Sequence, residues 1–358
     1  MHASHVFCNL LGEFFRPLRQ EQVVGMLGLV AWFSFCALII VVAGTFMARS
    51  ADRIAEVTGI GRTLVGLVLL AAGTSLPELM VGWTAVRMGS PDLTLGDLLG
   101  SSLMNLLILA VLDLFTRSQA RMLSSRAAVH ALSAGGTIVL KTIVLLAILL
   151  GSQSTFLRLG PGAWAIGITY LLCFRLIVLD QQVGRNEAAV AAEAEDTPPG
   201  MTLGQAVLVY LACAGAIVFA APQLAHTADH LTELTGLGKT FFGAVFIAGV
   251  TSLPEATATL AALRLGAPDL AIGNILGSNS FNMLILAFID FADPGALLGS
   301  VGPIHAITAT AGILVTAVVM LGLLSRAEKR YWLIEPDAVT VILLIVGSLY
   351  LVYLKGLA

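Results

Sequence analysis

The chain has 358 residues, of which 58% are hydrophobic and only 11% are charged. A soluble domain carries about 25% charged residues, and it could not bury this much apolar surface in one core. The composition therefore excludes a soluble enzyme, a disordered chain, a disulfide-rich secreted protein and a nucleic-acid binder, and the net charge of −3 indicates no bulk electrostatic partner.

Ten apolar runs follow one another along the chain. Each is close to the roughly 20 residues that a helix needs to cross a bilayer. They lie near residues 26–47, 61–84, 94–115, 127–150, 161–180, 203–221, 236–262, 270–291, 304–324 and 337–354. The sequence therefore predicts an all-α polytopic membrane protein with ten transmembrane helices, and residues 1–25 are expected to form a tail.

One long polar stretch, residues 181–200, interrupts these runs. It is acidic and contains a helix-breaking Pro-Pro-Gly sequence, so we expect a solvated linker. The linker separates five predicted helices over residues 26–180 from five over residues 201–358. Lys and Arg are more frequent in the connections on the linker's side, which predicts a cytoplasmic linker and two termini outside the cytoplasm.

A repeated motif relates the two sets of helices. Residues 74–78, with the sequence TSLPE, return 177 residues later as residues 251–255. The same offset, without a gap, matches Pro91–Leu93 to Pro268–Leu270, Gly100 and Ser101 to Gly277 and Ser278, Asn105 to Asn282, and Asp113 to Asp290. Because each set contains an odd number of helices, the second copy must be inverted in the membrane. The sequence thus predicts two inverted five-helix repeats with a site near the midplane where the copies meet.

Each copy of the motif places a glutamate inside an apolar run, directly after a proline. A lone carboxylate in hydrocarbon is costly, so Glu78 and Glu255 should face the protein interior or a cavity. Pro77 and Pro254 lack an N–H group, so each should break its helix and leave carbonyls that a cation can satisfy. Hydroxyl groups one turn away add further oxygens: Thr74, Ser75, Thr251 and Ser252. The alternative is a pair of proline kinks with protonated glutamates, but the recurrence in both copies favours a cation site.

The predicted third and eighth helices offer a polar face beside these glutamates. Residues spaced by four share one side of a helix. The face consists of Asp97, Ser101 and Asn105 in the first copy, and of Asn274, Ser278 and Asn282 in the second. Gly96, Gly100, Gly273 and Gly277 should permit close helix approach. The alternative for these residues is helix–helix hydrogen bonding alone. For Ser102 and Asn279 a structural role and a pathway role fit the sequence equally well.

The candidate ligands are carboxylate, amide, hydroxyl and carbonyl oxygens. Cysteine and histidine are absent from the set, which disfavours zinc and copper, whereas Ca²⁺ accepts about six to eight oxygens in flexible geometry. The same carboxylates could hold Na⁺ or protons, and competition for a shared site is the physical basis of antiport. The sequence has no Walker-type glycine loop, so we expect an ion gradient rather than a nucleotide to drive transport, with no cofactor.

At these residues the chain resembles the Ca²⁺/cation antiporter superfamily, in particular prokaryotic Na⁺/Ca²⁺ exchangers. The resemblance rests on GTSLPEL (73–79) with GSSLMN (100–105), and on VTSLPEA (250–256) with GSNSFN (277–282). It implies Ca²⁺ export in exchange for Na⁺, with the first and sixth helices sliding across the other eight. It also implies that Ca²⁺ is bound by the carboxylates of Glu78 and Glu255 and by the carbonyls of Thr74 and Thr251. The remaining polar residues would line the central and Na⁺ sites: Ser75, Ser252, Ser101, Ser278, Asn105 and Asn282.

The chain departs from that family's pattern in its charges. In well-studied members the position of Asn105 or Asn282 often carries an aspartate, and Ser102 stands where the motif has asparagine. Asparagine keeps an oxygen ligand but removes a titratable charge, so an H⁺/Ca²⁺ antiporter of the same architecture is the alternative. We hypothesise that Asp97 supplies the missing charge. Other acidic residues near span ends are expected to be caps or charges at the ion's path: Asp92, Asp113, Asp269 and Asp290.

Enzyme and channel functions fit the sequence less well. An enzyme would need a nucleophile–base pair or a metal motif, but the six histidines lie in the tail or toward span ends. A channel usually needs a symmetric oligomeric pore, whereas this chain carries its symmetry internally. We therefore expect a monomeric transporter in the cell (inner) membrane, whose partners are inorganic cations and lipid and not nucleotides or nucleic acids.

Overall fold

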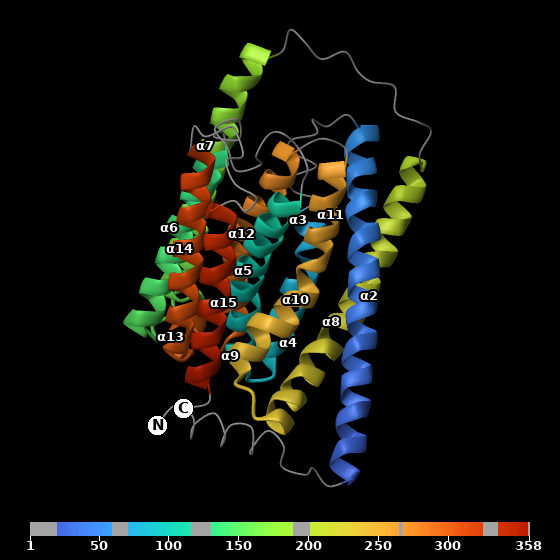
Figure 1. Ribbon diagram of the computed structural model, residues 1–358, viewed down its shortest axis with the longest axis vertical. Helices are drawn as coiled ribbons and strands as arrows, with labels where there is room; N and C mark the ends of the chain where they lie inside the picture. The colour runs from blue at the N-terminus through green and yellow to red at the C-terminus, as the bar shows by residue number, and fades with distance from the viewer. Residues whose placement is uncertain are drawn as a thin grey trace.

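The computed structural model describes residues 20–58, 71–115, 130–188, 201–264, 268–324 and 336–356. These residues are almost entirely helical (Figure 1). The first half contains α2 (Gln20–Thr58), α3 (Ala71–Thr74), α4 (Leu76–Arg87), α5 (Pro91–Phe115), α6 (Ala131–Leu150) and α7 (Pro161–Ala188). The second half contains α8 (Leu203–Thr235), α9 (Lys239–Phe242), the π-helix η3 (Gly243–Ile247), α10 (Ala248–Thr251), α11 (Leu253–Arg264), α12 (Pro268–Ile289), the 3-10 turn η4 (Asp290–Ala292), α13 (Leu297–Ser300), α14 (Ile304–Leu324) and α15 (Pro336–Gly356).

The helices confirm the predicted all-α polytopic membrane protein. Among the described residues, seven helices are long and apolar enough to cross a membrane. Lys239–Thr251 and Leu253–Arg264, bent by 44° at their junction, would form an eighth crossing. The apolar part of α7, Pro161–Ile177, is shorter, and residues 61–70 of the predicted second run lie outside the described ranges. The number of ten crossings therefore stays a prediction.

The two halves run in opposite directions. Figure 1 shows that α2 and α8, the first helices of the two halves, lie side by side and antiparallel. The beginning of α2 and the end of α15 lie at one end of the bundle, whereas the end of α7 and the beginning of α8 lie at the other. This is the arrangement expected of an inverted repeat.

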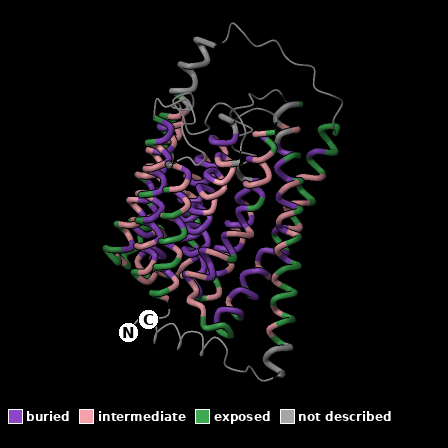
Figure 2. Tube along the Cα trace, viewed as in Figure 1, coloured by how far each residue is buried: buried purple, intermediate pink, exposed green. Residues whose placement is uncertain are grey.

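The core sits around α5 and α12. In the apolar window of α5, 72% of the residues are buried inside the protein, and in that of α12 the share is 67%. The corresponding share is 17% for both α2 and α8, which form a pair at the periphery. Figure 2 shows the same division, with buried residues along the inner helices and exposed ones outside. The third and eighth predicted helices are thus central.

Several helices are longer than the apolar runs that predicted them. The helix α2 begins at Gln20, inside the expected tail, and continues to Thr58, while α8 continues to Thr235 beyond the predicted residue 221. The expected linker also begins later, because α7 reaches Ala188. Hydropathy marks only the part of a helix that lies in the hydrocarbon of the membrane. Polar residues can extend the same helix into water, where they remain hydrated.

Candidate functional site

Both copies of the TSLPE motif interrupt a helix. The break between α3 and α4 falls at Ser75, and the break between α10 and α11 falls at Ser252. Each proline lies in the first turn of the helix that follows the break, where its missing N–H group is tolerated. The new helices start with bonds from Leu79 N to the Ser75 carbonyl, 3.1 Å, and from Ala256 N to the Ser252 carbonyl, 3.0 Å.

The breaks lie where the two repeats contact each other. The helix α5 of the first repeat packs against η3 and α10 of the second, and α12 of the second repeat packs against α3 and α4 of the first. Apart from Asn274, which is half-buried, the predicted site residues on these helices are buried. These residues are Thr74, Ser75, Pro77, Glu78, Asp97, Ser101, Asn105, Thr251, Ser252, Pro254, Glu255, Ser278 and Asn282.

The two glutamates face the opposite repeat. Glu78 is 0% exposed and lies beside the hydroxyl of Thr251, while Glu255 is 1% exposed and lies beside the hydroxyls of Thr74 and Ser75. The Glu78 carboxylate is also within electrostatic reach of Glu255 and Asp97. Each repeat thus supplies a carboxylate to the hydroxyl groups of the other, and the two arrangements are related by the repeat.

The glutamate oxygens have no hydrogen-bond partner among the described residues, and neither do the hydroxyls of Ser75 and Ser252. A buried charge without a partner costs far more than a paired one, because the protein replaces none of its hydration. Carboxylate and hydroxyl oxygens that converge in this way can be satisfied by a cation, or by protonation of the carboxylates. The arrangement therefore has the chemistry of a site that exchanges cations.

Asp97 joins this group through hydrogen bonds. The Thr251 hydroxyl donates to Asp97 Oδ1 at 3.0 Å, and the Ser101 hydroxyl donates to the same oxygen at 3.4 Å. The hydroxyls of Ser101 and Thr251 are 3.1 Å apart. Asp97 Oδ2 has no partner among the described residues. A third carboxylate, on α5, therefore lies in contact with the broken helix of the second repeat.

The asparagines form a contact between α5 and α12 that sequence reasoning left undecided. Asn105 Nδ2 donates to Asn279 Oδ1 at 3.0 Å, and Asn279 Nδ2 donates to the Ser102 carbonyl at 3.2 Å. Asn279 and Ser102 are equivalent positions, 177 residues apart, so this contact lies where the two repeats cross. Asn282 is buried, and its amide makes no hydrogen bond within the described part of the chain.

The repeat symmetry fails at Asn274, the counterpart of Asp97. Its amide donates to the Thr259 hydroxyl at 3.1 Å and to the Glu255 carbonyl at 3.4 Å. These bonds keep it against α11 of its own repeat. The two positions therefore have different roles, since Asp97 bonds across the repeats and Asn274 bonds within one.

The glycines of α5 allow the backbone of α9 and η3 to approach α5 closely. Gly277, which repeats Gly100 on α12, has no such close neighbour. A Cβ atom on Gly100 would overlap the backbone of Ala244 in η3, and one on Gly96 would lie 2.7 Å from the Thr240 carbonyl oxygen. A Cβ atom on Gly277 would meet no atom within 4 Å. The close approach brings α10, and with it Thr251, against Asp97.

No cluster of charged ligands alone could bind a metal ion here. In the described ranges, no three His, Cys, Asp or Glu side chains lie close enough together to hold one. An ion bound beside the glutamates would therefore also need hydroxyl, amide or carbonyl oxygens, which is the mixed set that Ca²⁺ and Na⁺ accept.

Two of the acidic residues near span ends make contacts with other segments of the chain. Asp290 accepts hydrogen bonds from the backbone of Gly160, at 2.6 Å, and of Leu297, at 2.8 Å. Asp92 Oδ1 lies 2.8 Å from His305 Nε2. Asp113 is buried, and the side chain of Asp269 lies outside the described residues.

Comparison with protein families identifies the chain. The family described as "Sodium/calcium exchanger protein" matches residues 28–181 and 205–354. The chain belongs to the sodium/calcium exchanger family. Its members are transporters, so this exchanger is a cation antiporter and a multi-pass membrane protein.

Relatives of this exchanger cover most of its length. CaxA of Alkalimonas amylolytica is 30% identical over 271 residues, which are 73% of this chain and 82% of CaxA. The sodium/calcium exchanger MaX1 of Methanosarcina acetivorans is 28% identical over 284 residues, which are 70% of this chain and 79% of MaX1.

Solved structures show the same fold. The sodium-calcium exchanger NCX_Mj superposes with a TM-score of 0.56 at 18% identity, covering 93% of this chain and 100% of its own. The structure of YfkE superposes with a TM-score of 0.60 at 18% identity, covering 93% of this chain and 96% of its own. At this level of identity the likeness extends to the fold alone.

Proposed function

We propose that this exchanger moves Ca²⁺ out of the cytoplasm in exchange for Na⁺ by alternating access. The observation that carries the proposal is the pair of buried glutamates, Glu78 and Glu255. They occupy equivalent positions after two helix breaks, they face hydroxyl groups of the opposite repeat, and their oxygens lack partners among the described residues. An inverted repeat with its site at the crossing of the copies is the plan of a secondary transporter.

The proposed Ca²⁺ ligands are the carboxylates of Glu78 and Glu255 and the carbonyls of Thr74 and Thr251. Two carboxylates match the double charge of Ca²⁺, and its flexible coordination accepts the carbonyls at the helix breaks. The motif prolines, Pro77 and Pro254, hold the breaks open because neither can donate a backbone hydrogen bond.

The proposed Na⁺ and pathway residues surround these ligands. They are Ser75, Ser252, Ser101, Ser278, Asn105, Asn282 and Asp97. Asp97 supplies the third carboxylate of the site, in place of the aspartate that the family resemblance implies at the position of Asn105 or Asn282. Its hydrogen bond from Thr251 supports this role, because Thr251 is itself a proposed Ca²⁺ ligand. Na⁺ and Ca²⁺ would then compete for overlapping oxygens.

Exchange of Ca²⁺ for H⁺ is the second candidate for this site. The observation that favours it is the asparagine at both 105 and 282, because an amide adds no negative charge that would help to bind Na⁺. The buried glutamates would then carry the exchanged protons themselves. Whether Ca²⁺ is exchanged for H⁺ or for Na⁺ would depend on whether Asp97 stays charged.

The proposed setting is the cell (inner) membrane, with the linker at 181–200 in the cytoplasm and both termini outside. The excess of Lys and Arg on the linker's side supports this orientation. We further propose a monomer, because both halves of the site come from one chain, and we propose that it needs no cofactor, because the sequence has no Walker-type glycine loop.

Ca²⁺ flux into proteoliposomes tests the coupling. Purified exchanger is reconstituted, and uptake of radioactive Ca²⁺ is measured under an outward Na⁺ gradient and, separately, under a pH gradient with no Na⁺. The Na⁺ gradient should drive uptake and the pH gradient should not. Uptake driven by protons alone would establish the second candidate, and uptake under neither gradient would reject both.

A further inference from the structure

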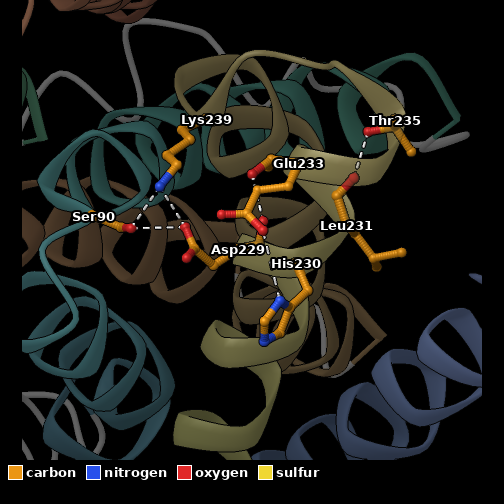
Figure 3. A network of polar contacts seen from close by, with 8 residues as sticks. Ser90, Asp229, His230, Leu231, Glu233, Thr235 and Lys239 are labelled. Atoms are coloured by element: carbon orange, nitrogen blue, oxygen red, sulfur yellow. Dashed lines mark hydrogen bonds and ion pairs between the residues drawn. The ribbon is translucent and has the colours of Figure 1, made fainter.

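A second polar cluster lies where α8 ends, and it contains none of the proposed ion-site residues (Figure 3). Lys239 Nζ lies 2.6 Å from Asp229 Oδ1, and the Ser90 hydroxyl donates to the same oxygen at 2.7 Å. Lys239 Nζ also donates to Ser90 Oγ at 2.8 Å. The three side chains thus close a triangle of short contacts.

The triangle joins three different elements. Asp229 lies on α8, Lys239 is the first residue of α9, and Ser90 directly precedes α5 at its corner with α4. The side chains of Asp229 and Lys239 are 18% and 36% exposed, and Ser90 is 2% exposed. A charged pair that is partly desolvated and supported by a third group is worth more than an exposed one.

The ion pair joins the two sides of the turn between α8 and α9. Gly236, which ends α8, has a φ of 69°, in the left-handed region that favours glycine, and Gly238 precedes α9. Any displacement of α8 relative to α9 must be absorbed at this turn. Because Asp229 and Lys239 lie on either side of it, such a displacement would separate them.

The rest of the inner face of α8 is apolar, so α8 can slide along the neighbouring helices at little energetic cost. It contributes small and aliphatic side chains to an apolar cluster with α2, α4 and α5, including Ala221, Leu224, Ala225 and Ala228. Contacts of this kind have no directional preference, whereas the contacts of Asp229 do. Only 17% of the residues in the apolar windows of α2 and α8 are buried inside the protein.

From these observations we infer that Asp229, Lys239 and Ser90 form a latch that holds α8 closed against α5 and α9 at this end of the transporter. When the latch is formed, the end of α8 packs on the α4–α5 corner and closes the path from the site to this side of the membrane. When it breaks, α8 is free to move and this side opens. The inference rests on the alternating access proposed above.

The repeat supports a conformational role for the pair. At the offset of 177 residues, Asp229 corresponds to Asp52 and Lys239 corresponds to Arg62, so both copies carry an acid and a base with this spacing. Arg62 lies outside the described residues, and the inference concerns the pair in the second copy alone.

A labelling experiment on the full chain tests the latch. Ala228, which is buried beside Asp229, is replaced by cysteine in a background in which the four native cysteines are serine. Its modification by a membrane-impermeant thiol reagent is timed in proteoliposomes. Asp229→Asn and Lys239→Gln should each raise the labelling rate about fivefold, as expected for loss of a partly buried ion pair.

Matched variants separate a latch from a general effect. Glu233→Gln removes an exposed carboxylate one turn further along α8 and should leave the rate unchanged, as should Lys239→Arg, which keeps the pair. The double variant Asp229→Asn with Lys239→Gln should label no faster than either single variant. Unchanged labelling in both single variants, equal acceleration by Glu233→Gln, or additive acceleration in the double variant would each overturn the inference. Labelling requires no ion flux, so a failure of the proposed exchange would not be mistaken for a failure of the latch.

Discussion

The Thr251 hydroxyl donates a 3.0 Å hydrogen bond to Asp97, although the two residues belong to opposite repeats. The equivalent pair in the other half would be Thr74 and Asn274, but Asn274 bonds instead to Thr259 on α11. The proposed site would thus combine two symmetric glutamates with one nearby carboxylate that breaks the symmetry. We expect this third carboxylate to affect how much positive charge the proposed site can accept.

Replacing Asp97 by asparagine should weaken Ca²⁺ binding. The amide oxygen can still accept the hydrogen bond from Thr251, so the fold should persist while one negative charge is lost. We expect the Ca²⁺ concentration for half-maximal flux to rise about tenfold, the effect of roughly 1.4 kcal/mol of lost interaction. Flux measured over a series of Ca²⁺ concentrations reports this change.

Restoring the charge on the other repeat is the matched control. Asn282→Asp in the Asp97→Asn background places a carboxylate on α12 in the proposed site, and it should recover much of the lost affinity. An Asp97→Asn variant with wild-type Ca²⁺ dependence and wild-type pH dependence would show that Asp97 only supports the contact of α5 with α10.

Gly100→Ala should destabilise the exchanger, and Gly277→Ala should not. The added methyl group on Gly100 would overlap the Ala244 backbone, whereas at Gly277 it would enter open space. Overpacking of this kind costs about 1–3 kcal/mol, while alanine is favoured over glycine in a helix by roughly 0.5–1 kcal/mol. Thermal unfolding in detergent should therefore show a lower midpoint for Gly100→Ala and an equal or higher one for Gly277→Ala. Equal midpoints for the two variants would mean that η3 can move away from α5.

Lys141→Met should stabilise the exchanger. Lys141 is completely buried in α6, and its ammonium group contacts only dipoles of α14 in the described structure: the Thr316 hydroxyl at 3.1 Å and the Gly312 carbonyl at 3.4 Å. Replacing a buried charge by an apolar side chain of similar volume is commonly neutral or stabilising, by about 1–4 kcal/mol for ion pairs. The unfolding midpoint should rise. A fall would indicate that Lys141 finds an acidic partner in another conformation of the transport cycle.

Much of the central region could be predicted because the repeat is visible in the sequence. Glu78 and Glu255 stand out as charges inside apolar runs, and the symmetry brings them together without any knowledge of packing. The all-α fold follows from the apolar runs, and the central place of α5 and α12 follows from the offset of the repeat. At the two glutamates, the repeat in sequence corresponds to a repeat in geometry, whereas Gly100 and Gly277 share a sequence position but not a packing environment.

Features that depend on contacts between the repeats could not be predicted. The π-helix η3 is fitted to the glycines of α5, and its own sequence, GAVFI, resembles any apolar helix. The hydrogen bonds of Asn279 and the ion pair of Asp229 with Lys239 join segments that only the tertiary fold places side by side. Lys141 could be located in a span, but its partners on α14 could not.

The measurement that tests the central claim most directly is Ca²⁺ flux through Glu78→Gln and Glu255→Gln in proteoliposomes. Each change keeps the side-chain volume and removes one carboxylate from the proposed site. Both variants should lose Ca²⁺ flux completely while keeping a wild-type unfolding midpoint or a higher one, because an unpaired buried carboxylate is removed. Glu233→Gln, on the exposed side of α8, should transport like the wild type. Retained Ca²⁺ flux in both Glu78→Gln and Glu255→Gln would contradict the proposed site.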